Sequence, residues 1–124
     1  MYLGLRYPEV FGNLLVMSPS VWWANRDILK KVHRTNHKAA QRIWLDVGTC
    51  EGSNPESCLR NVEDLRDALI LKGWRIGRDL KFVADEGAGH DEKAWGARIR
   101  GALKFLFPAQ ARSGETSGVE FSLG

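Results

Sequence analysis

The chain of 124 residues lacks any long hydrophobic run. Its apolar stretches are short, such as residues 14–17, whereas a helix that spans a bilayer needs about 20 consecutive apolar residues. Residues 1–11 contain Arg6, Pro8 and Glu9, where a secretory signal requires an unbroken apolar segment. We therefore expect no membrane partner and a cytoplasmic location.

Cysteine is scarce as well. The two cysteines, Cys50 and Cys58, are too few for a disulfide framework, and their spacing does not match a zinc site. Cys50 is interpreted as a small buried residue beside a loop, because nothing nearby in the sequence would activate its thiol. His33 and His37 lie four residues apart, but no third metal ligand follows them in a usable pattern. The sequence thus predicts no metal site and no cofactor.

Aromatic residues are missing from the most basic segment. Residues 26–42 contain six lysines and arginines against Asp27 alone, a local charge of +5 in a chain whose net charge is +3. Such a segment could attract nucleic acid through its phosphates, but it offers no ring on which bases could stack. We interpret it as a solvated helix face and expect no nucleic-acid partner. The alternative, a nucleic-acid binder, predicts affinity that falls steeply with salt.

The residues that are present indicate one globular domain. Hydrophobic residues make up 44% of the chain and charged residues 27%. Three short and nearly continuous apolar runs, at residues 14–17, 43–47 and 80–84, alternate with helical patterns. Continuous apolarity is typical of strands covered on both faces. We predict an α/β fold with three layers, α/β/α, and a mostly parallel sheet.

Capping signals place the helices between these strands. Asn25 is expected to cap the first helix, and Asn54 and Gly73 are expected to delimit the second. The last helix begins after His90 and ends before Pro108. Its expected buried face consists of Trp95, Ile99, Leu103 and Leu106.

Both ends of the chain depart from a complete domain. Residues 2–5 resemble the closing turn of a helix that has no start, and three strands leave a sheet edge and apolar helix faces uncovered. We therefore expect residues 1–108 to form the C-terminal part of a larger fold, with self-association through the uncovered surface. Residues 109–124 are rich in glycine and serine and are predicted to be a disordered tail.

Two loops carry the candidate site residues. Glu51 lies in the small-residue loop after the second predicted strand, and His90 lies in the loop after the third. The carboxyl ends of parallel strands meet at one edge of a sheet, where α/β proteins place their ligands. An acid followed by a histidine on successive strands is also the order of the acid and base in α/β-hydrolases.

Four segments of the sequence carry a resemblance to a known family: residues 5–12, 17–23, 46–52, and 87–91 together with Trp95. In this order, over residues 1–107, they resemble the putative-esterase family of α/β-hydrolases. That family includes esterase D-like proteins, enterochelin and other siderophore esterases, feruloyl esterases and mycolyltransferases. The resemblance implies that Glu51 is the triad acid, that His90 is the general base, and that Trp22 and Trp23 line a pocket for a small-molecule ester.

One element of the family is missing from the chain. The family's nucleophile lies in a Gly-x-Ser-x-Gly elbow, which these 124 residues do not contain. The resemblance places the elbow before Met1, so we expect the C-terminal fragment of a serine hydrolase without turnover of its own. Ser18 or Ser20 is conceivable as a substitute, but no glycine-flanked elbow holds either one. The alternative is a non-catalytic α/β interaction module in which Glu51 and His90 are structural.

Overall fold

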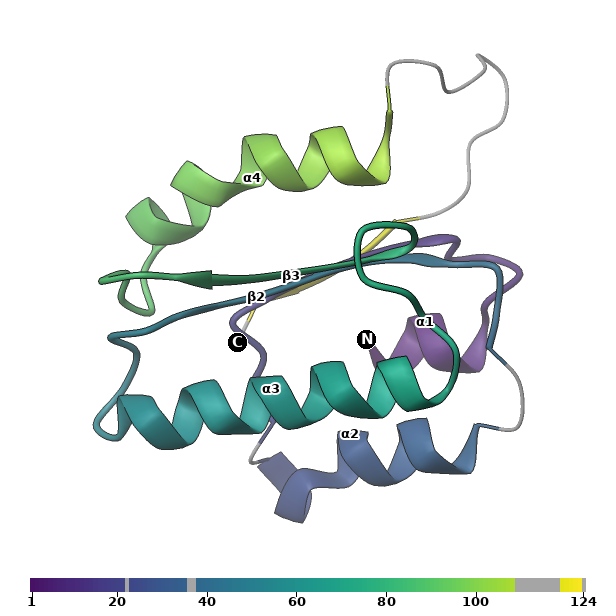
Figure 1. Cartoon of the computed structure of the whole chain (residues 1–124), viewed down its shortest axis with the longest axis horizontal. Coiled ribbons are helices and arrows are strands. Elements are labelled where there is room, and N and C mark those ends of the chain that lie inside the picture. The colour runs from purple at the N-terminus through teal and green to yellow at the C-terminus, as the bar shows by residue number, and fades with distance from the viewer. Residues whose placement is uncertain (22, 36–37, 109–118, 124) are drawn as a thin grey trace.

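The computed structural model describes residues 1–21, 23–35, 38–108 and 119–123, and its centre is a four-stranded parallel sheet (Figure 1). The order of the strands is β3-β2-β1-β4, with β1 at Asn13–Met17, β2 at Arg42–Gly48, β3 at Leu80–Asp85 and β4 at Val119–Leu123. Helices α1 (Tyr2–Arg6), α2 (Trp23–Arg34) and α3 (Pro55–Leu71) lie on one face, and α4 (Glu92–Leu106) lies on the other. The predicted three-layer α/β fold is confirmed.

The two central strands explain the continuous apolar runs of the sequence. All of β1 is buried, and β2 is buried after its first residue. Successive side chains of a strand point to opposite faces, so Leu14 and Val16 pack toward α2 and α3 while Leu15 and Met17 pack toward α4. Because helices cover both faces, neither set of side chains can be polar without a buried partner.

The predicted ends of α3 and the predicted start of α4 are confirmed. The Asn54 side chain accepts a hydrogen bond of 3.2 Å from the backbone N–H of Ser57, and Asp91 accepts one of 2.8 Å from the N–H of Ala94. The start predicted for α2 is wrong. This helix begins at Trp23, so Asn25 lies inside the helix rather than at its cap.

The buried face of α4 also differs from the prediction. Leu103 is 41% exposed, whereas Ala102 and Arg98 are buried against the sheet. The face that contacts the sheet runs through positions 95, 98, 99, 102 and 106, and residue 103 lies one step around the helix from it. Hydrophobic periodicity favours the apolar Leu103 on the buried face, whereas burial of Arg98 depends on its charged partners at the ends of the strands.

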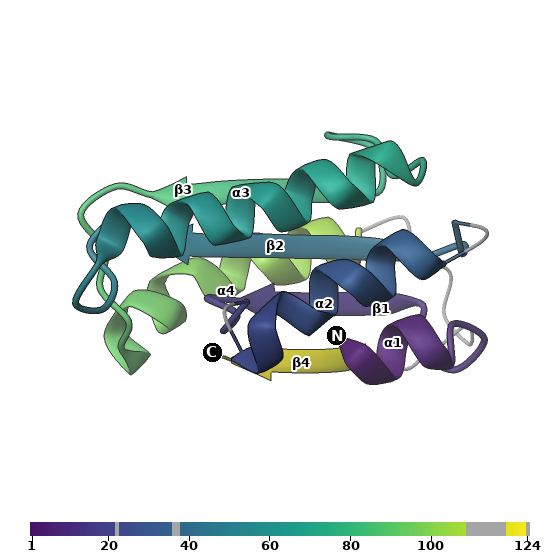
Figure 2. The ribbon, with the colours of Figure 1, turned by 90° about the horizontal axis from the view of Figure 1, so that it is seen from below.

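The C-terminal segment was also predicted incorrectly in part. Residues 119–123 form β4, which pairs with β1 in parallel and makes one edge of the sheet (Figure 2). The buried Glu120 carboxylate accepts a hydrogen bond of 3.0 Å from the N–H of Gly4 and pairs with the Met1 ammonium. An open edge of β1 offers unpaired N–H and C=O groups, and β4 satisfies them. The rest of the predicted tail, residues 109–118, lies outside the described residues.

Candidate active site

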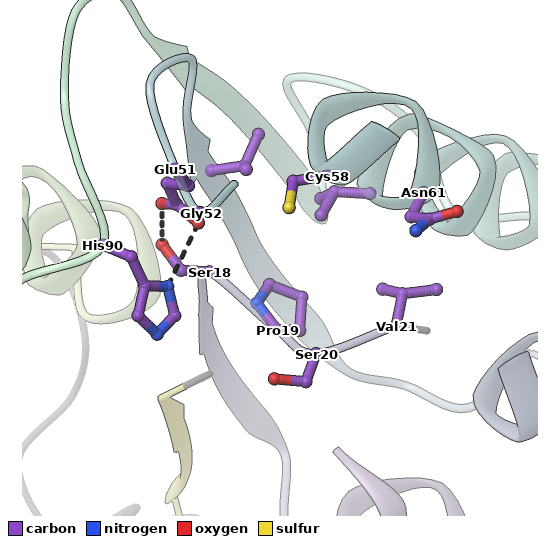
Figure 3. Close-up of a pocket in the computed structure, with 11 residues that line it drawn as sticks. Ser18, Pro19, Ser20, Val21, Glu51, Gly52, Cys58, Asn61 and His90 are labelled. Atoms are coloured by element: carbon purple, nitrogen blue, oxygen red, sulfur yellow. Dashed lines mark hydrogen bonds and ion pairs between the residues drawn. The ribbon is translucent and has the colours of Figure 1, made fainter. Parts of the chain in front are cut away.

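The carboxyl ends of three neighbouring strands bring Ser18, Glu51 and His90 together (Figure 3). Ser18 directly follows β1, Glu51 lies in the loop after β2, and His90 lies in the loop after β3. The Oε2 atom of Glu51 is 3.2 Å from Nδ1 of His90. Two side chains that are 39 positions apart in the sequence thus meet at the edge of the sheet where they were predicted to lie.

Hydrogen bonds between the two loops set this distance. The N–H of Cys50 donates a hydrogen bond of 2.9 Å to the carbonyl of Ala88, and the N–H of Gly87 donates one of 2.8 Å to the Thr49 hydroxyl. At Gly48 an added Cβ would lie only 2.2 Å from the Ala88 carbonyl oxygen, so the loops can approach this closely only with glycine there. The backbone therefore positions Glu51 against His90.

The Glu51 carboxylate is buried and fully engaged. Its side chain is 5% exposed. Its Oε1 atom accepts a hydrogen bond of 2.7 Å from the N–H of Gly48 and a second from the Ser18 hydroxyl, while Oε2 faces His90. Because both oxygens face donors, the carboxylate is held in one orientation.

The His90 ring is held on two sides and still reaches the surface. The Trp95 ring packs edge to face against it, with ring centroids 5.0 Å apart and an interplanar angle of 85°. Nδ1 faces Glu51, and the other ring nitrogen points away from that carboxylate (Figure 3). Since the side chain is 35% exposed, the imidazole can be approached from outside.

A pocket of about 250 Å³ opens beside the pair. Ser18, Ser20, Glu51 and His90 are among the polar residues that line it, and Val21, Val47 and Val62 contribute to its apolar wall. This volume lies just below the range of roughly 300–1,000 Å³ that is common for small-molecule sites. The pocket can hold a small acyl or alcohol group next to the histidine.

The two tryptophans predicted to line the pocket are only partly described. Trp22 lies outside the described residues, and Trp23 begins α2. Val21, the residue before them in the sequence, lines the pocket. Their contact with a substrate stays a prediction.

A buried arginine below the pocket was missed in the sequence. Arg98 of α4 donates from Nε to Asp46 and from Nη1 to Asp85, each at 3.1 Å, and from Nη2 to the Ser18 hydroxyl at 3.2 Å. Its side chain is 5% exposed. A guanidinium shared among three acceptors on the ends of β1, β2 and β3 ties α4 to the edge of the sheet that carries the site.

Asp46 is the fully buried partner of this arginine. It also accepts hydrogen bonds from Trp44 Nε1 at 2.7 Å and from the N–H of Ser18 at 3.1 Å. Burial raises the pKa of the Asp46 carboxyl, although the bond from Trp44 and the charge of Arg98 oppose that shift. The signal for this pair was present in the sequence, because an aspartate inside a run of buried strand residues requires a charged or hydrogen-bonding partner.

Other candidate residues do not join the site. Cys50 is exposed, so its interpretation as a buried residue is wrong. Its backbone N–H bonds to the neighbouring loop, but its side chain is accessible to solvent. His33 is exposed on α2, and His37 lies outside the described residues. Among the described residues, no cluster of histidine, cysteine and carboxylate side chains could hold a metal ion, and no helix has the length and apolarity to cross a membrane.

Basic residues between positions 26 and 42 serve contacts within the fold. Arg26 pairs with Asp64, and Lys38 pairs with Asp79 at 2.8 Å. The Arg42 guanidinium donates to a backbone carbonyl of α4 at 2.7 Å. Three of the six basic residues in this segment therefore have structural partners within the fold.

Comparison with solved structures defines the class of fold. The chain resembles the structure titled "Crystal structure of BES protein from Bacillus cereus", with a TM-score of 0.61 and 21% identity. The match covers 85% of this chain and 39% of that protein. The similarity places the chain in the same α/β fold.

Sequence comparison identifies the family. The family model for putative esterases matches residues 1–106, and the chain therefore belongs to the putative esterase family. It is 26% identical over 112 residues to the uncharacterized protein YbbA of Bacillus subtilis, and 22% identical over 118 residues to an iron(III) enterobactin esterase of Dickeya dadantii. Each match covers 86% of this chain, but 44% and 26% of those proteins respectively. The chain thus spans less than half the length of these relatives.

Proposed function

We propose that this chain supplies the acid and the general base of a serine hydrolase that acts on carboxylic esters. The observation that carries the proposal is the 3.2 Å contact between Glu51 Oε2 and His90 Nδ1, at the mouth of a pocket. In a Ser-His-acid triad the acid holds the imidazole in the tautomer whose other nitrogen can accept a proton. Membership of the esterase family supports the same chemistry.

The proposed reaction passes through an acyl-enzyme. A serine hydroxyl attacks the ester carbonyl while His90 Nε2 takes its proton, and the imidazolium then gives that proton to the departing alcohol. In the second half water attacks the acyl-enzyme and gives a proton to His90, and the imidazolium returns that proton to the serine oxygen as the bond to the acyl group breaks and the carboxylic acid leaves. Glu51 stabilises the imidazolium in both halves and fixes the orientation of the ring.

The nucleophile of this proposal comes from outside these 124 residues. They contain no Gly-x-Ser-x-Gly elbow. The relatives are longer than the matched region, so a longer protein has room for the elbow and for the donors of the oxyanion hole. Without those groups most of the transition-state stabilisation is lost, and we expect no turnover by this chain alone. Ser18 does not replace the nucleophile, because its hydroxyl proton is directed at Glu51.

The test uses a fluorophosphonate probe and a 4-nitrophenyl ester. The first sample is this chain. The second is a chimera in which the segment of the Dickeya esterase that precedes the matched region is fused before Met1. We expect the chain to stay unlabelled and the chimera to be labelled and active.

Histidine variants of the chimera provide the control. Replacement of His90 by alanine should lower the rate by a factor on the order of 10⁴ or more, whereas His33→Ala, at an exposed position, should leave it unchanged. Labelling of the 124-residue chain itself, or chimera turnover that survives His90→Ala, would contradict the proposal.

A further inference from the structure

The hydroxyl group of Ser18 has a defined direction. Ser18 is 2% exposed, and its oxygen accepts hydrogen bonds of 3.2 Å from Trp95 Nε1 and 3.2 Å from Arg98 Nη2. A hydroxyl oxygen has two acceptor positions and one proton. The two N–H donors occupy the acceptor positions, so the proton is left to point at Glu51, which receives it at Oε1.

The backbone of Ser18 is held in a conformation that serine rarely adopts. Its φ is +48°, in the left-handed region that side chains other than glycine usually avoid. Its N–H bonds to the Asp46 carbonyl at 2.9 Å and to the Asp46 carboxylate at 3.1 Å, which holds the residue there. Such strain persists where the surroundings impose it, and it is concentrated at functional sites.

We propose that Ser18 is a positioning residue for the acid and that Arg98 fixes its hydroxyl. The inference rests on the proposed function of Glu51 and His90. Glu51 Oε1 is fixed by two donors, the Gly48 N–H and the Ser18 hydroxyl, and this places Oε2 against His90. Without the hydroxyl the carboxylate can turn about its last bond, and Oε2 leaves Nδ1.

Arg98, on helix α4, holds the Ser18 hydroxyl in place. Its ion pairs with Asp46 and Asp85 anchor the guanidinium to β2 and β3, and its remaining contact is with Ser18. Trp95 adds a second link, because the same indole donates to Ser18 and packs against His90. Helix α4 thereby acts on the histidine through the serine and the glutamate.

The experiment measures the tautomer of His90 by long-range ¹H–¹⁵N NMR, with the ring neutral. The samples are the unmodified 124-residue chain, Ser18→Ala, Ser18→Gly, and the control Ser53→Ala, an exposed serine in the same loop as Glu51. We expect the proton on Nδ1 in the unmodified chain and in Ser53→Ala. Both Ser18 variants should lose roughly half or more of the Nδ1–H population, since the carboxylate no longer holds one orientation.

The two Ser18 variants separate the hydroxyl from the backbone strain. Ser18→Gly relieves the backbone strain that Ser18→Ala retains, so a loss of Nδ1–H in both variants is caused by removal of the hydroxyl. If Ser18→Ala does not fold, Ser18→Gly alone provides the test. Retention of Nδ1–H in Ser18→Gly overturns the inference, whatever Ser18→Ala does. Absence of Nδ1–H in the unmodified chain instead overturns the pairing of Glu51 with His90, and with it the proposed function.

Discussion

The two faces of the sheet are stabilised by different kinds of contact. The face toward α2 and α3 is a continuous apolar cluster that includes Leu14, Ile43, Leu65 and Leu69. The face toward α4 has a smaller apolar cluster, and it also holds a buried network of charges and hydrogen bonds centred on Arg98.

This difference separates stability from positioning. Apolar contacts are not directional, and they stabilise in proportion to the area they bury. Hydrogen bonds and ion pairs are directional, and a buried pair adds little net stability although breaking it is costly. The first face therefore supplies most of the free energy of folding, and the second orients the residues of the site.

Removing the charge of Arg98 is expected to have the largest effect. Arg98→Met leaves the Asp46 carboxylate buried without its charged partner, which should lower the free energy of unfolding by about 3–5 kcal/mol. Urea denaturation measures this loss. Arg100→Met, at an exposed position of the same helix, should change stability by no more than about 0.5 kcal/mol.

The pH dependence of Arg98→Met sharpens this prediction. Burial already raises the pKa of Asp46 above its ordinary value of 3.8, and loss of the guanidinium should raise that pKa further. The folded state then holds the proton more tightly than the unfolded state, so stability should fall as the pH rises from about 4. If Arg98→Met lowers the free energy of unfolding by the same amount at pH 4 and at pH 7, the charge of Asp46 is not the cause of that loss.

A cavity on the other face should reduce stability without disturbing the site. Leu65 is fully buried under α3, and Leu65→Ala should cost about 3 kcal/mol, within the range of 2–5 kcal/mol seen for such deletions. We expect the His90 tautomer in the folded protein to be unchanged. A tautomer shift in Leu65→Ala would mean that the two faces are not separate in function.

A methyl group at Gly48 tests the contact between the loops. The added Cβ would meet the Ala88 carbonyl, so Gly48→Ala should cost about 1–3 kcal/mol and should push the His90 loop away from Glu51. Gly77→Ala is the control for a glycine with open space around it, although its φ of +84° carries strain of its own. Only Gly48→Ala should alter the amide and ring signals of His90.

The ion pair between Lys38 and Asp79, which lies outside the candidate site, should have the smallest effect. Burial opposes ionisation of Asp79, but the bond from the Lys38 ammonium and the N–H of Arg75 outweigh it and lower the pKa of this carboxyl. Lys38→Met should cost about 0.5–1 kcal/mol at pH 7, because the pair is largely but not fully buried. The difference should vanish as the pH falls below 3.8 through the folded pKa of Asp79, whereas exposed Lys93→Met should show none.

Much of the fold could be predicted because its signals are local. The cap at Asn54 and the continuous apolar runs of β1 and β2 report structure within a few residues of themselves. Strand β4 gives a weak local signal, since its place depends on the edge of β1, more than 100 positions away in the sequence. The start of α2 was misplaced at Asn25 because a capping residue type does not identify which cap is used.

The site was predictable to a similar degree. Glu51 and His90 follow strands that end at one edge, so topology alone brings them together. The roles of Ser18 and Arg98 depend on side chains that meet across 80 positions of sequence, which no spacing rule reports. The family resemblance indicated Glu51 and His90, but not the residues that hold them in place.

The central claim, that Glu51 orients His90, is tested most directly by comparing the His90 tautomer in the unmodified chain and in Glu51→Gln. In the variant, the Gly48 and Ser18 donors require an oxygen at the Oε1 position, which turns the amide NH₂ toward His90. That NH₂ donates to Nδ1 and should move the ring proton to Nε2. The account therefore predicts Nδ1–H in the unmodified chain and Nε2–H in Glu51→Gln, and identical tautomers in the two proteins would contradict it.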